Sequence, residues 1–158
     1  MYAGADAAEG TAANNVDGGS TGGRVVTRLP SAVPGISDVV HVAGGLLLVS
    51  GQTALSDDAD VPEDFDAELD RAFAALVTAL AGAGALPADL ARVTIYVRDL
   101  PNRSLETIRA VRDRWIAPGS RPASALIGVA ALFDPRVRVE IDAIAVAPAG
   151  YAPAGSAA

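Results

Sequence analysis

The chain has 158 residues, which is enough for one domain with a substantial core and too few for two ordinary domains. Its formal net charge is −7, and because its 12 basic residues, all arginine, are scattered among 19 carboxylates, we expect no nucleic-acid binding. The absence of lysine excludes a Schiff base, the absence of cysteine excludes thiolate chemistry, and one histidine cannot build a multi-histidine zinc site.

Residues 1–23 contain almost only small and polar side chains. We expect them to form a disordered leader, because packing would not offset the entropy lost on ordering them. The segment lacks the apolar run of a secretory signal, and no part of the chain approaches the roughly 20 apolar residues of a membrane span. We therefore expect a cytoplasmic protein with no membrane partner.

Three strands are predicted next. A short strand at 25–29 precedes a hairpin, whose strands at 39–42 and 46–50 flank Gly44 and Gly45. A pair of glycines supplies the positive φ that a tight hairpin turn requires.

Two helices follow, with a strand between them. Apolar residues at helical spacing over 65–80 follow Pro62, a residue that favours a helix start. Alternating apolar and polar residues at 92–98 predict a strand with one buried face. A second helix is predicted at 105–115, where the apolar positions are Leu105, Ile108, Val111 and Trp115.

Two late strands, at 123–132 and 136–146, complete the order β-β-β-α-β-α-β-β. The predicted fold class is α+β, with two helices on one face of a six-stranded sheet. We expect the domain to span 24–147, and 148–158 to form a loose C-terminal tail.

The predicted sheet has more apolar surface than two helices can cover. Residues 46–49 and much of 125–132 are apolar at successive positions, which indicates that both faces of the sheet are dry. A second copy of the chain is the simplest cover for the other face, so we expect a homo-oligomer. The alternative is that tail segments fold back over the sheet.

Several short motifs in this order resemble the RidA/YjgF family. They are VSGQ at 49–52, VTIYVRDL at 93–100, RPAS at 121–124 and VEIDAIAV at 139–146, and the match runs from about residue 25 to residue 146. The resemblance implies a chorismate-mutase-like fold, a homotrimer with a barrel-like interior, and small-molecule clefts between neighbouring subunits. It also implies hydrolysis of imines or enamines without a metal or organic cofactor.

The resemblance breaks at one position that the family's chemistry needs. In the family an arginine within a Pro-Ala-Arg-Ser run holds the substrate carboxylate, whereas this chain has Ser124 there. Glu140 matches the family's glutamate, which orients or activates water. The alternative for Glu140 is a solvent-facing carboxylate, or one paired with Arg138 or Arg98.

Other candidate site residues follow from the same comparison. Arg109 and Arg121 could replace the missing arginine, although a solvated helix face and a loop salt bridge are the alternatives for them. We expect His41, Tyr96 and Trp115 to be structural. The residues expected to line the cleft are Ser37, Ser50, Gly51, Ser124, Ala125, Leu126 and Arg109, around the catalytic Glu140.

Two functions remain open. The first is an enzyme of specialised metabolism that hydrolyses, tautomerises or cyclises an imine, an enamine or a related intermediate, and is not a standard 2-iminoacid deaminase. The second is a noncatalytic protein that binds a small molecule or acts as an accessory factor. The missing arginine is compatible with both. A third function, deamination of small imino acids with Arg121 or Arg109 as the anchor, ranks below them, because a bidentate clamp depends on placement within about 0.5 Å.

Overall fold

The computed structural model describes residues 26–30, 37–42, 45–56 and 60–151, so the expected leader lies outside the described residues. Short 3-10 turns at Pro87–Asp89, Leu100–Asn102 and Pro118–Ser120 lie between the main elements. Those elements are β1 (Val26–Pro30), β2 (Ser37–Val42), β3 (Leu46–Gln52), α1 (Phe65–Gly82), β4 (Leu90–Arg98), α2 (Leu105–Trp115), β5 (Ala123–Val129) and β6 (Val139–Val146).

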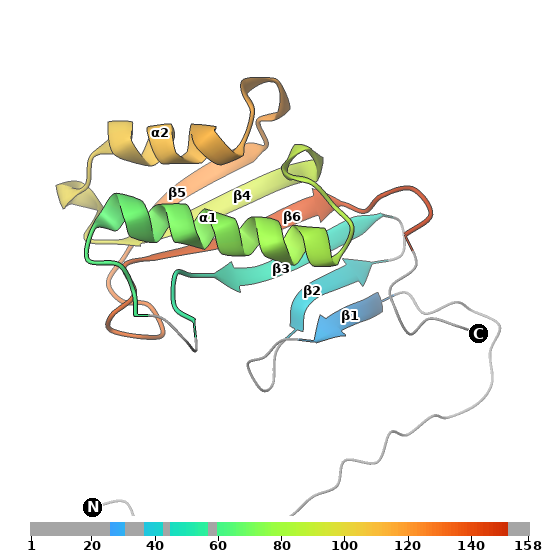
Figure 1. Ribbon diagram of the computed structural model, residues 1–158, viewed down its shortest axis with the longest axis horizontal. Helices are drawn as coiled ribbons and strands as arrows, with labels where there is room; N and C mark the ends of the chain where they lie inside the picture. Colours follow the sequence, from blue (N-terminus) through green and yellow to red (C-terminus); the bar gives the residue numbers. More distant parts are fainter. Residues whose placement is uncertain (1–25, 31–36, 43–44, 57–59, 152–158) are drawn as a thin grey trace, which may run out of the picture.

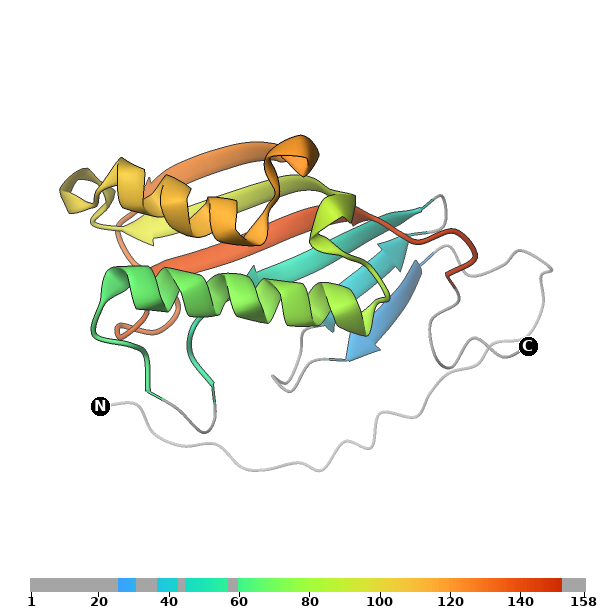
Figure 2. The same ribbon diagram turned by 45° about the horizontal axis from the view of Figure 1, so that its top comes forward.

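The strands form one sheet in the order β1-β2-β3-β6-β4-β5. All neighbours are antiparallel except β4 and β5, which are parallel because α2 carries the chain back between them. Both helices lie on the same face of the sheet (Figures 1 and 2). The α+β class with two helices on one face is therefore confirmed.

The helices form where apolar spacing and end signals predicted them. Leu69, Phe73 and Leu80 of α1 are fully buried against the sheet. The helix ends before Gly84, whose φ of +70° is a left-handed conformation that favours glycine. At the start of α2, Ser104 Oγ accepts a hydrogen bond from the backbone N–H of Thr107 at 3.2 Å, a typical helix N-cap.

The β2–β3 hairpin also matches the prediction. Val42 pairs with Leu46, and the N–H of Gly45 donates to the carbonyl of Val42 at 3.1 Å. Gly45 has a φ of +95°, so a glycine is needed at this turn position. Gly44, the other glycine of the expected pair, lies outside the described residues.

The two late strands are shorter than the predicted ranges 123–132 and 136–146. β5 ends at residue 129 and β6 begins at residue 139. Between them Asp134 organises a turn, in which its carboxylate accepts the N–H of Arg136 at 2.8 Å and its carbonyl accepts the N–H of Val137 at 3.1 Å. Local bonds from an aspartate to the following backbone compete with sheet pairing, which shortens both strands.

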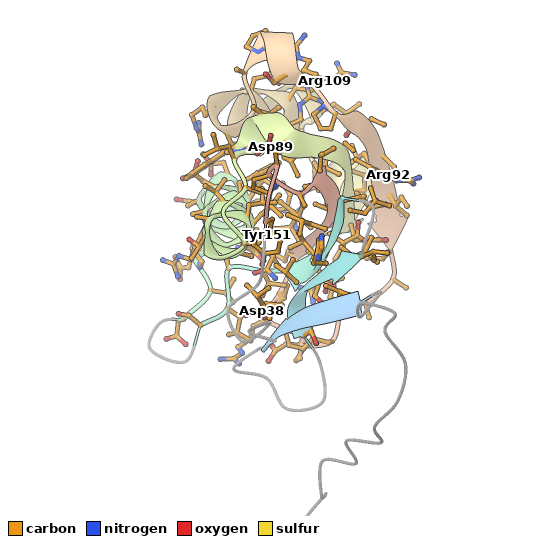
Figure 3. All side chains as sticks on the ribbon, turned by 90° about the vertical axis from the view of Figure 1, so that its right-hand side faces the viewer. Asp38, Asp89, Arg92, Arg109 and Tyr151 are labelled. Atoms are coloured by element: carbon orange, nitrogen blue, oxygen red, sulfur yellow. The ribbon has the colours of Figure 1, made fainter. Side chains whose placement is uncertain are left out.

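The described start of the expected tail, 148–151, packs against the fold. The ring of Tyr151 meets that of His41 edge to face, with centroids 5.2 Å apart, and Tyr151 contacts the core between the helices and the sheet (Figure 3). Burial raises the pKa of Tyr151. This segment therefore lies on the helix side of the sheet and leaves the opposite face uncovered.

Candidate functional site

The face of the sheet opposite the helices, called here the open face, carries apolar side chains that a monomer exposes. Strand alternation directs every second residue of β3, β4, β5 and β6 to this face. The large exposed ones are Leu46 (45% exposed), Leu48 (41%), Ile127 (40%) and Val146 (52%).

Four polar residues interrupt this apolar surface where β4 pairs with β6. Tyr96 lies opposite Glu140, and Thr94 lies opposite Asp142. The hydroxyl of Tyr96 donates to Oδ2 of Asp142 at 2.9 Å. This hydrogen bond and burial raise the pKa of Tyr96. The four side chains form one cluster, called here the β4–β6 cluster.

The β4–β6 cluster lines a depression with a cavity volume of about 1410 Å³. Its lining includes open-face residues of β3, β4 and β6, the end of β3, the turn before β6, and Ala75 of α1. Besides the cluster, the residues that line the depression include Asp38, Leu48, Ser50, Gly51, Asp60, Arg92, Phe133, Arg136 and Ile144.

Glu140 is half-buried in this depression. Its neighbours Val139 and Ile141 are fully buried toward the helices, so the strand parity expected for Glu140 is observed. Within the described part of the chain it has no ion pair or side-chain hydrogen bond. Arg138 binds Glu68 instead, and Arg98 binds the carbonyl of Pro135 at 2.6 Å. Burial raises the pKa of Glu140, and the charge of Asp142 raises it further.

Gly51 makes room for the carboxylate of Glu140. The pairing of β3 with β6 shifts register between Val49 and Gln52, which marks a β-bulge at residues 50–51. A Cβ at position 51 would lie 1.9 Å from Oε1 of Glu140 and 2.6 Å from its Cδ. The carboxylate can therefore occupy this position only because residue 51 has no side chain.

Ser37 and Ser50, two residues expected to line the cleft, are in direct contact. Oγ of Ser50 donates to the backbone carbonyl of Ser37 at 2.5 Å, which joins the start of β2 to the bulge of β3. Ser50 and Gly51 both line the depression with Glu140. The structure thus brings four of the expected site residues to one end of the sheet.

The remaining expected residues do not reach Glu140 within one chain. Ser124 and Leu126 pair with Val93 and Ile95, which face the helices, while Ala125 points to the open face beside Thr94. All three lie on β5 at the edge of the sheet, and none of them lines the depression.

The two arginines weighed as substitutes are also separate from Glu140. Arg109 is exposed on α2, at the end of the molecule away from Asp38 (Figure 3). Arg121 forms an ion pair with Asp113 at 3.1 Å, in keeping with the alternative of a loop salt bridge.

Tyr96 was expected to have a structural role in packing, but its hydroxyl also contacts Asp142. The alternation of β4 already placed Tyr96 on the face opposite Val93 and Val97. What the sequence could not show is that β4 pairs with β6, which sets Tyr96 beside Glu140 and Asp142. Asp142 itself could have been found, because it lies two residues from Glu140 and shares its face.

A buried ion pair fixes the start of the strand that carries Glu140. Glu68 of α1 is fully buried, and its carboxylate accepts the backbone N–H of Arg138 at 2.6 Å and Nε of the same residue at 2.5 Å. Arg138 also donates to the carbonyls of Pro62 and Glu63. The first turn of α1 therefore holds β6 two residues before Glu140.

A family model described as Endoribonuclease L-PSP matches residues 27–147, more than half of the chain. The chain belongs to this family, known also as the RidA/YjgF family. None of the curated proteins matches the sequence.

Solved structures of RidA/YjgF proteins share the fold. A member of the YjgF/YER057c/UK114 family from Mycobacterium tuberculosis has 28% identity and a TM-score of 0.65, with 77% of this chain and 98% of that chain covered. A YjgF-family protein from Neisseria meningitidis has 27% identity and a TM-score of 0.64, covering 78% and 95%. The protein YJGH has 30% identity and a TM-score of 0.64, covering 71% and 83%.

The described part of the chain lacks both a metal-binding cluster and a membrane-spanning helix. It contains no group of three or more histidine, cysteine, aspartate or glutamate side chains placed to hold a metal ion. Neither of its two α-helices is both long and apolar enough to cross a membrane.

Proposed function

We propose that this RidA-family protein is a small-molecule enzyme that acts on an imine, an enamine or a related intermediate in a cleft between subunits, with Glu140 as the acid and base. The observation that carries the proposal is the position of Glu140, half-buried in the depression, seated over Gly51 and without an ion pair in the described region. A raised pKa suits a carboxyl group that must take up and release a proton near neutral pH.

Hydrolysis of an imine needs only such a proton shuttle and a water molecule. The oxygen of water forms a bond to the imine carbon while Glu140 takes a proton from the water. Glu140 then returns this proton to the nitrogen, which gives a carbinolamine. In a second transfer Glu140 moves the proton of the new hydroxyl group to the nitrogen, the remaining carbon–nitrogen bond breaks, and a carbonyl compound and an amine leave. Tautomerisation of an enamine uses the same carboxyl group to move one proton between carbon and nitrogen.

The assembly that we propose is a homotrimer, as the family resemblance implies. The exposed apolar residues of the open face support self-association, since burying them in another copy removes them from water. In a closed ring, the edge strand β5 of one subunit would approach the depression of the next. Ser124, Ala125, Leu126 and Arg109 would then join Glu140 across the interface, which accounts for their separation within one chain.

The proposed reaction is not the ordinary deamination of a 2-imino acid. Deamination in the family relies on an arginine that binds the substrate carboxylate, and Ser124 stands in its place. A hydroxyl can donate one hydrogen bond but cannot form the bidentate, charge-assisted pair of a guanidinium group. A substrate from specialised metabolism that lacks this carboxylate fits better. The cytoplasm remains the location we predict.

The test uses two imines that differ in the carboxylate. N-benzylidenemethylamine has none, and its hydrolysis to benzaldehyde is followed by absorbance. Freshly generated 2-iminopropionate has one, and its hydrolysis is followed by ammonia release. We expect the protein to accelerate the first reaction and not the second. Glu140→Gln should lower the first rate at least about 100-fold, because the proton shuttle is lost. Glu106→Gln, an exposed change on α2, is the matched control.

Each outcome of this test bears on the proposal. Equal rates for the wild type and Glu140→Gln would remove Glu140 from the mechanism. Clear acceleration with 2-iminopropionate would show that the missing arginine does not prevent deamination. No acceleration of either imine, combined with Glu140-dependent ligand binding, would favour the alternative of a noncatalytic binding protein.

A further inference from the structure

The β4–β6 cluster presents hydrogen-bond acceptors to a ligand and few donors. Tyr96 has one hydroxyl proton, and that proton is donated to Asp142 at 2.9 Å. The phenol oxygen can therefore only accept further hydrogen bonds, either from the hydroxyl of Thr94 or from a ligand. The carboxylate of Glu140 beside it is also an acceptor when ionised. A ligand that pairs with both groups must bring its own N–H or O–H donors.

No arginine of the described residues forms an ion pair with a carboxylate of the β4–β6 cluster. Arg136 binds Asp134 through Nη2 at 2.9 Å and Nε at 3.1 Å, and Asp60 lies 3.8 Å from its Nη1. Arg92 lines the same depression, is exposed, and has no ion pair with a described carboxylate. The position where relatives carry an arginine holds Ser124, which in the same chain faces the helix side of the sheet.

The walls next to the cluster are apolar and aromatic. Leu48 and Ile144 pair across β3 and β6 on the open face, one step from Asp142. Phe133 on the rim is 71% exposed, and the ring of Tyr96 adds a second aromatic surface. Aromatic faces attract cations and repel anions, so these rings favour the same ligand charge as the carboxylates.

We propose that the ligand of this site is a cation, a protonated amine or an iminium ion on an apolar body, whose N–H group is bound by Glu140 and by Tyr96 held in place by Asp142. This inference rests on the proposed function for the location of the site and deepens it by naming the charge of the substrate. A site built around an arginine selects a ligand with a carboxylate, whereas the site proposed here selects a ligand with a positive charge. The nitrogen end of the ligand enters the β4–β6 cluster, and its apolar body lies against Leu48 and Ile144.

The experiment compares three probes with the same ring and different charge. Benzylammonium, benzyl alcohol and benzoate are titrated into the full-length isotope-labelled protein at pH 7, and dissociation constants are obtained from amide chemical shifts. We expect benzylammonium to bind about tenfold more tightly than benzyl alcohol and benzoate to bind more weakly than both, as one ion pair would cause. The largest shifts should occur on β4 and β6.

Variants that each remove one negative charge show which carboxylate causes the preference for the cation. Glu140→Gln should weaken benzylammonium binding about tenfold and leave benzyl alcohol almost unchanged. Asp142→Asn should weaken it by a smaller factor, because asparagine can still accept the Tyr96 hydroxyl while its charge is lost. Glu106→Gln removes one exposed negative charge from α2 and should change nothing. Raising the salt concentration should weaken benzylammonium binding more in proteins that retain Glu140 than in Glu140→Gln.

Two results would overturn the inference: benzoate binding as tightly as benzylammonium, or benzylammonium binding that Glu140→Gln leaves unchanged. These results are distinct from a failure of the proposed enzyme. If the cation preference is absent but Glu140→Gln still abolishes imine hydrolysis, the catalytic proposal stands and the charge assignment falls. If the cation binds through Glu140 but no imine is hydrolysed, the charge assignment stands and catalysis falls.

Discussion

At the scale of single residues, the site depends on a contact between a carboxylate and a glycine. The carboxylate of Glu140 occupies the volume that any side chain at position 51 would fill. The Val-Glu-Ile-Asp motif was enough to select Glu140 as a candidate, and strand alternation placed it on the correct face. The β-bulge that turns Gly51 toward Glu140 depends on the pairing of β3 with β6. The sequence of neither strand specifies this pairing by itself.

A substitution at Gly51 should separate catalysis from stability. In Gly51→Ala the new methyl group forces the end of the Glu140 side chain out of its position. We expect imine hydrolysis to fall at least about tenfold, because a catalytic group displaced by an ångström loses its geometry. The free energy of unfolding should change by less than about 1 kcal/mol, since the displaced atoms end a flexible side chain.

Gly119→Ala is the matched control for this substitution. A Cβ at position 119 would have no described atom within 4 Å, and the φ of Gly119 lies outside the left-handed region, so the methyl group is accommodated without strain. Its imine hydrolysis and its urea midpoint should equal those of the wild type. Undiminished activity in Gly51→Ala would show that the carboxylate need not lie over the bulge.

At the scale of elements, ion pairs fix the helices to each other and to the strand of the site. Glu68 joins α1 to the start of β6 through Arg138. Asp70, two residues later, accepts Nη2 of Arg114 at 2.8 Å and Nε1 of Trp115 at 2.9 Å, which joins α1 to α2. Helical spacing predicted both helices, but it could not match carboxylates to arginines separated by 44 or more positions.

The link between the helices should make stability depend on pH. The hydrogen bond from Arg114 lowers the pKa of Asp70, the bond from Trp115 adds to this, and partial burial opposes it. A pKa that is lower in the folded state stabilises the fold above the unfolded pKa, and this stabilisation is lost as the pH falls through the folded pKa. The side chain of Asp70 is 41% exposed, so we expect a contribution of less than about 1 kcal/mol.

Urea unfolding of the wild type and Asp70→Asn measures this contribution. The variant should be less stable at pH 7 by roughly 0.5 kcal/mol, and the difference should shrink toward zero at about pH 3 and below. A difference that stays constant between these pH values would mean that the charge of Asp70 has no part in it.

At the scale of the whole molecule, the open face is the apolar surface that the described part of one chain leaves exposed. Among the described residues, four large apolar side chains are exposed on it, while the described part of the tail packs on the helix side. Apolar runs in the sequence already indicated that both sheet faces are dry. Association of several copies through this face would cover the runs and enclose the depression that contains Glu140.

A charge on the open face should dissociate the assembly. We expect the wild type to sediment as a homotrimer at micromolar concentration. In Leu48→Arg, a buried unpaired guanidinium would weaken each interface by about 3 kcal/mol or more, so the protein should sediment as a folded monomer. Leu86→Arg, at a position that is 64% exposed in the turn before β4, is the control and should remain assembled. A monomeric wild type, or an assembled Leu48→Arg variant, would contradict the proposed use of this face.

The sequence by itself determined the α+β class, the two amphipathic helices, the strand parity of Glu140 and the serine at position 124. These features are local, because they depend on spacing, on turn residues and on the identity of single positions. Only the tertiary structure decided that Tyr96 and Asp142 adjoin Glu140, that Gly51 makes room for its carboxylate, and that Ser124 faces away from it. These contacts depend on strand order and register, which join residues far apart in the chain through pairing that neither partner specifies alone.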